Sequence, residues 1–186
     1  WTKRLHIFFL YFKTNQLLRN SLLGIHRGIR GKNPETESPT ATLMERIVSN
    51  KSIEFKSNTY NKAHAYYYKN LEAIIRKSNH RGVPVVISEL ISNTKDLRPF
   101  CSVKTTAYPA ADVVYNEAIR FEKEGNYDNA RALFEQARDL DCIRFRASGD
   151  INRIIRQLSR KYNINLVPMK AIFESASPNG LIGNNL

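Results

Sequence analysis

The fold class follows from one run of apolar residues, Val83 to Ile91 (VPVVISELI). The run is rich in β-branched side chains and nearly free of polar ones, which is typical of a strand buried on both faces of a parallel sheet. A second run of this kind is Ile164 to Met169 (INLVPM). We therefore expect an α/β fold with a parallel sheet.

Helical periodicity surrounds the two runs. Residues Tyr60 to Asn79 predict a helix that ends near Gly82, because apolar side chains recur on one side and charged ones on the other. Ser148 to Tyr162 predicts a further helix before the second run. By residue count, the chain should be mostly helical.

Between these elements, residues 110–141 predict a helical hairpin that turns at Gly125-Asn126. Small side chains let two helices approach, and aromatic side chains fill the remaining gap. The pattern resembles a single tetratricopeptide repeat. Since a solenoid needs about three or more such repeats to bury a continuous core, we interpret the hairpin as an insert within the α/β fold.

Charge divides the chain into three parts. The net charge is +12, and residues 1–32 carry seven Lys and Arg and no acid. Residues 1–30 predict a basic amphipathic helix, residues 31–42 a linker rich in Pro, Ser and Thr, and residues 43–186 the α/β domain. The basic helix could contact nucleic acid or an anionic membrane surface, but a solvated helix face is favoured. No apolar run approaches the roughly 20 residues of a membrane span.

Composition and motifs exclude several classes of protein. A chain with 42% hydrophobic residues, nine Phe and nine Tyr is not disordered as a whole. Two cysteines, Cys101 and Cys142, do not make a disulfide scaffold, and two buried free thiols are favoured over a pair. The four His have no metal-ligand spacing, and the zinc-protease and nucleophile-elbow motifs are missing. We expect no metal and no cofactor.

A polar loop, residues 92–109, follows the first predicted strand. In open α/β sheets, ligands gather outside the carboxyl ends of the strands, so Asn93 and Asp96 are candidate site residues. The same side chains could instead form a turn by hydrogen bonding to the backbone, and spacing alone favours the turn.

Two parallel strands are too few for an independent sheet, because parallel sheets are stable almost only as larger, helix-covered assemblies. We expect that the chain pairs with another molecule or that the first half of the sheet lies upstream of Trp1.

Several segments together resemble a known family. Residues 42–102, including VPVVISELISNTKDLRPF, are similar to the later half of a subgroup of SGNH/GDSL-type hydrolases that carries a tetratricopeptide-like insert. The segments GNYDNARALFEQARDLDCIRFRAS and INLVPMKAIFESAS follow in the same order. The likeness covers nearly all of the chain after the linker and is most specific at residues 83–100 and 140–148.

The resemblance implies a flavodoxin-like, three-layer domain that hydrolyses ester or acyl bonds. A Ser nucleophile, a His base oriented by an Asp, and an oxyanion hole perform this chemistry. The nucleophile block would precede Trp1 and the Asp-x-x-His block would follow Leu186, so no catalytic residue carries over to this chain. We therefore expect the chain to be inactive alone. The whole enzyme would act on a small ester or an acylated carbohydrate, and members of such subgroups often act at the cell envelope.

What this chain would contribute is one wall of the cleft. The residues expected to shape the substrate rim or to hold its loop are Ser92, Asn93, Asp96, Arg144 and Arg146. Structural packing is an equal interpretation for the two Arg. Two other classes stay open, namely a protein-interaction module built on the hairpin and a nucleic-acid-binding module with stacking tyrosines at residues 66–68. We expect no specific nucleic-acid partner.

Overall fold

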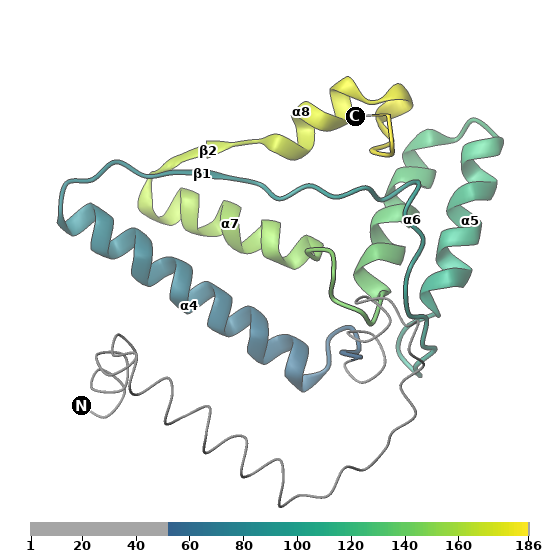
Figure 1. Cartoon of the computed structure of the whole chain (residues 1–186), viewed down its shortest axis with the longest axis horizontal. Coiled ribbons are helices and arrows are strands. Elements are labelled where there is room, and N and C mark those ends of the chain that lie inside the picture. The colour runs from purple at the N-terminus through teal and green to yellow at the C-terminus, as the bar shows by residue number, and fades with distance from the viewer. Residues whose placement is uncertain (1–51, 186) are drawn as a thin grey trace, which may run out of the picture. The chain divides into compact units, whose positions relative to one another are not determined.

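The computed structural model describes residues 52–185. The predicted basic helix at residues 1–30 and the linker at residues 31–42 lie outside the described residues. Figure 1 shows the helices and strands with their labels. None of the helices in the described part is long and apolar enough to cross a membrane.

Two long helices, α4 (Asn58–His80) and α7 (Gly149–Tyr162), lie side by side, as Figure 1 shows. The hydroxyl of Ser57 caps α4 by accepting a hydrogen bond from the Tyr60 backbone N–H. Helix α7 buries Ile155 and Leu158 on its apolar face. Both helices were predicted from periodicity, and both predictions are confirmed within two residues at each end.

The sheet has two short parallel strands, β1 (Val86–Ser88) and β2 (Asn165–Val167). Val86 pairs with Asn165 and Ser88 with Val167, which places both carboxyl ends at the same edge. The predicted parallel pairing is therefore confirmed. The described residues form a mostly helical, mixed α/β unit.

The prediction of a long strand buried on both faces is wrong. Only three residues of the run Val83 to Ile91 form the strand, and Val86 is 64% exposed. Burial on both faces requires neighbours on both sides, and β1 has one neighbouring strand among the described residues. After the strand, the Asn152 carboxamide from α7 binds the backbone N–H and C=O of Leu90, each at 2.8 Å.

The second predicted run is also shorter as a strand, because Met169 begins helix α8 (Met169–Ala176) after Pro168. The buried carboxylate of Glu89, just after β1, accepts a hydrogen bond from the Lys170 backbone N–H at 3.1 Å and pairs with Arg156 of α7. The Glu89 side chain thus connects the end of β1 to both α7 and α8. The 3-10 helix η1 (Pro178–Gly180) then leads to the C-terminal segment.

The helical hairpin consists of α5 (Ala111–Lys123) and α6 (Tyr127–Leu140), as predicted for residues 110–141. Gly125 takes a positive φ of 75° at the turn, and the Asn126 side chain caps α6. Ala118, Ala130 and Ala137 are completely buried where the helices meet. The Tyr115 and Phe134 rings fill the gap in an edge-to-face contact at 5.3 Å.

Candidate functional site

The carboxyl end of β1 is where the polar loop meets the C-terminal segment. The backbone N–H groups of Thr94 and Lys95 both donate to the Ile182 carbonyl oxygen at 3.1 Å. The loop residues and Ile182 are far apart in sequence, so this contact exists only in the folded chain. It lies beyond the carboxyl end of β1, six residues past Ser88, on the side of the sheet where α/β proteins gather their ligands.

Asn93 and Asp96 both use their side chains at this junction. The Asn93 Oδ1 accepts a hydrogen bond from the Asp96 backbone N–H at 2.8 Å, so the turn favoured by spacing is confirmed. The Asn93 Nδ2 donates to Asn184 Oδ1 at 2.6 Å, and the Asp96 Oδ2 accepts from the Asn184 backbone N–H at 2.7 Å. The structure thus brings these two predicted site residues together, around a third residue that the sequence did not single out.

Ser92 lies nearby and borders a small cavity between the segment that follows β1 and the helices α6 and α8. The cavity has a volume of about 20 Å³, which is room for about one water molecule. It is therefore too small to hold a substrate. Its charged lining residues are Arg131, Glu135, Arg138, Lys170 and Glu174.

Arg146 lies behind the loop and is almost fully buried. One nitrogen, Nη1, donates to the carbonyl oxygens of Asn93 and Leu97, at 3.1 Å and 2.7 Å. The other, Nη2, pairs with the Asp141 carboxylate at 3.2 Å. Burial lowers the pKa of the Arg146 guanidinium, while the charge of Asp141 opposes this shift. Arg146 thus holds the loop, which is one of the two roles expected for it.

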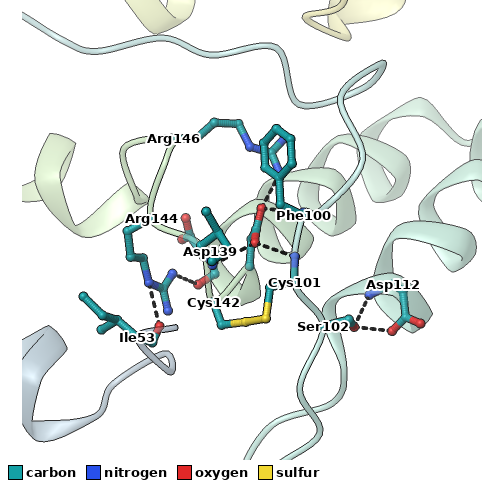
Figure 2. Close-up of a disulfide and its surroundings, with 11 residues drawn as sticks. Ile53, Phe100, Cys101, Ser102, Asp112, Asp139, Cys142, Arg144 and Arg146 are labelled. Atoms are coloured by element: carbon teal, nitrogen blue, oxygen red, sulfur yellow. Dashed lines mark hydrogen bonds and ion pairs between the residues drawn. A yellow bond between two sulfur atoms is a disulfide. The ribbon is translucent and has the colours of Figure 1, made fainter. Parts of the chain in front are cut away.

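Asp141 is the centre of this arrangement, although the sequence did not single it out. Its carboxylate also accepts hydrogen bonds from the backbone N–H groups of Phe100, Cys101 and Ile143, at 3.0–3.1 Å. Figure 2 labels two of these partners, Phe100 and Cys101, beside the disulfide. The partners Phe100 and Cys101 lie about 40 residues away in sequence, so no local spacing could reveal the role of Asp141.

Arg144 packs against α4. Its Nε donates to the Ile53 carbonyl oxygen at 3.0 Å and its Nη1 to the Asp139 carbonyl oxygen at 2.6 Å (Figure 2). The guanidinium carbon lies 4.8 Å from the centre of the Tyr60 ring. Arg146 and Arg144 therefore hold different parts of the chain. The contacts of Arg144 fit structural packing, which is the other interpretation given for it.

Cys101 and Cys142 form a disulfide, so the preference for two free thiols is wrong. Figure 2 shows the bond between the two cysteines, with Arg144 and Arg146 nearby. The backbone N–H of Cys142 also donates to the Cys101 carbonyl oxygen at 3.2 Å. The two cysteines are 41 residues apart, and only the fold brings their backbones within bonding distance.

A second polar cluster joins α4 to the start of α7. The Tyr60 hydroxyl lies 3.0 Å from Ser148 Oγ and 2.9 Å from Asp150 Oδ2. The His64 ring contacts the same Ser148 hydroxyl through Nε2 at 2.9 Å. Ser148 is only 5% exposed and His64 is half-buried, and their contact joins the two helices. The cluster could not be predicted from the sequence, because its residues on α4 lie 84–90 positions from their partners at the start of α7.

Asp150 in this cluster makes stability depend on pH. Burial alone would raise the pKa of its carboxyl, but hydrogen bonds from Lys56 and Tyr60 outweigh burial and hold the pKa below its ordinary value. The unfolded carboxyl then binds a proton at a higher pH than the folded one. Stability from Asp150 is therefore complete above about pH 4 and is lost as the pH falls through the folded pKa.

We expect Asp150→Asn to lower the free energy of unfolding by about 1–3 kcal/mol at neutral pH. The decrease in this free energy below about pH 4 should be smaller in the variant than in the wild type. Urea titrations between pH 2.5 and 7 measure both effects. Asp128→Asn is the matched control, because the Asp128 carboxylate is 89% exposed. An acid limb as steep in Asp150→Asn as in the wild type would contradict the role of Asp150.

No group of three or more His, Cys, Asp and Glu within residues 52–185 is placed to hold a metal ion. The candidate site thus consists of the loop at residues 92–97, the C-terminal segment at residues 182–184, and Arg146 with Asp141 behind them. No family model, curated protein or solved structure matches the chain.

Proposed function

We propose that this chain is part of a serine ester or acyl hydrolase of the SGNH/GDSL type and forms one wall of its cleft. The observation that carries the proposal is the junction at the carboxyl end of β1, where the polar loop and the C-terminal segment meet. This is the edge of a parallel sheet at which α/β enzymes bind substrates. The substrate class is a small ester or an acylated carbohydrate.

The exposed strand β1 supports a sheet that continues beyond the two strands described. Val86 in β1 and Val83, which precedes the strand, are each more than half exposed, although β-branched side chains in parallel strands are normally covered. Further strands of the same enzyme would cover them. The Ser nucleophile and the Asp-x-x-His block would belong to those other parts of the enzyme.

The test compares two proteins, the 186-residue chain and a protein expressed from a coding region extended in both directions. With p-nitrophenyl acetate, we expect turnover by the extended protein and none by the 186-residue chain, because the proposal assigns the chain no nucleophile. A fluorophosphonate probe, which labels activated serines, should mark only the extended protein.

Two outcomes would contradict the proposal. One is turnover by the 186-residue chain that a serine-directed inhibitor abolishes. The other is an extended protein that neither hydrolyses esters nor reacts with the probe. In the second case, salt-dependent binding of a random oligonucleotide would support the nucleic-acid-binding alternative instead.

A further inference from the structure

The loop at residues 93–97 is held firmly from one side. Arg146 donates hydrogen bonds to the carbonyl oxygens of Asn93 and Leu97, and the Tyr115 hydroxyl donates to the Lys95 carbonyl oxygen at 2.5 Å. Arg146 and Tyr115 are both buried, and Arg146 is itself anchored by Asp141. Three carbonyl groups of a five-residue loop are thus fixed by side chains from elsewhere in the fold.

The other side of this loop holds the C-terminal segment. Two backbone N–H groups bind the Ile182 carbonyl oxygen, and the side chains of Asn93 and Asp96 bind Asn184. With these partners, the Asn93 amide and the Asp96 Oδ2 bind the chain itself at an exposed position. They are placed to orient a segment of protein, in contrast to the substrate-contacting role expected from the sequence.

Gly183 shows how closely the two segments approach. It is buried, and a Cβ atom at this position would fall against the Asp96 carboxylate. Only a residue without a side chain therefore fits between Ile182 and Asn184 while Asp96 keeps its bond to the Asn184 N–H. The Gly183 backbone thus lies close to the Asp96 side chain, and a Cβ atom here would displace the Asp96 carboxylate.

From this geometry we infer that Asn93 and Asp96 are positioning residues that fix the course of the chain after Ile182 at the carboxyl end of β1. The inference rests on the proposed function, under which the Asp and His of the hydrolase lie beside this wall of the cleft. Groups that transfer protons must be held within about 0.5 Å of their productive position. We call the contacts of Asn93 and Asp96 with Asn184 the clamp. The clamp would therefore act on the rate of the chemical step and not on substrate affinity.

The first measurement follows the clamp directly, by hydrogen–deuterium exchange in the full-length protein. In Asp96→Ala, the Asn184 N–H loses a hydrogen bond to a charged acceptor, so exchange in a peptide spanning residues 181–185 should be about tenfold to a hundredfold faster. Asp96→Asn retains an oxygen acceptor and should recover most of the protection. Asp128→Ala, on the hairpin, is the matched control and should leave this peptide unchanged.

The second measurement is kinetic and uses the same variants with p-nitrophenyl acetate. For Asp96→Ala we expect kcat to fall about tenfold or more with KM within about twofold, and we expect Asp96→Asn to recover part of kcat. Asn93→Ala should behave like Asp96→Ala. An exchange peptide from α7 reports whether each variant is folded, and a variant that alters it is replaced by its conservative partner.

Unchanged exchange at residues 181–185 in Asp96→Ala would overturn the clamp. A raised KM with unchanged kcat would instead place Asn93 and Asp96 against the substrate, as the sequence suggested, and would also overturn it. If the wild-type protein hydrolyses no ester, the proposed function fails, while the exchange experiment still decides whether the clamp exists.

Discussion

Replacing Asp141 with alanine is expected to lower the free energy of unfolding by about 3–5 kcal/mol. The carboxylate is 2% exposed and binds three backbone N–H groups and the Arg146 guanidinium. Its removal leaves these N–H donors without an acceptor. The charge of Arg146, which is 8% exposed, would then stay buried without a counter-charge. Urea unfolding followed by circular dichroism measures the loss.

Asp128→Ala is the control for this prediction, because the same change at an exposed carboxylate should cost less than about 1 kcal/mol. The variant Asp141→Leu combined with Arg146→Met should be more stable than Asp141→Ala, since it removes the unpaired charge as well. The double variant should still be less stable than the wild type, because the backbone N–H groups that Asp141 bound stay unpaired. A cost below about 1 kcal/mol for Asp141→Ala would show that the carboxylate does not organise this region.

Removing the disulfide is the second change with a large expected effect. The double variant Cys101→Ser, Cys142→Ser should lose about 2–4 kcal/mol, because the bond closes a loop of about 40 residues in the unfolded chain. That loop contains the entire hairpin α5 and α6. Urea unfolding of the oxidised wild type and of the variant gives the difference.

A reducing agent provides the internal control. Dithiothreitol should lower the stability of the wild type to about that of the double variant and should leave the variant unchanged. Thiol titration of the unfolded, non-reduced wild type should find no free cysteine. Two free thiols there, with equal stability of the two proteins, would mean that the cysteines do not pair.

The helices could be predicted because their signals are local. In the hairpin, small residues recur at helical spacing and Gly125 marks the turn, so both helices and their contact were predicted correctly. The parallel pairing of the two apolar runs was also predictable from their character. The length and burial of the strands were not, since these depend on which neighbours cover them. Val86 is exposed for that reason.

The candidate site was predictable only in its location. A polar loop after an apolar strand indicates the carboxyl edge of a sheet, and Asn93 and Asp96 do lie there. Their partner Asn184 lies about 90 residues further along the chain, and no periodicity links positions so far apart. For the same reason the contacts of Asn93 and Asp96 with Asn184 could not be predicted, while their expected place at a substrate rim stays a prediction.

The amino-acid sequence by itself determined the helices, the hairpin and the direction of the two strands, because each depends on side chains a few residues apart. Only the tertiary structure decided that Cys101 pairs with Cys142, that Asp141 anchors Arg146, and that the turn at Asn93 holds Asn184. Each of these contacts joins groups that only the folded chain holds together, and the Asp141–Arg146 pair is also buried. Their energies therefore depend on the folded environment, which no short stretch of sequence contains.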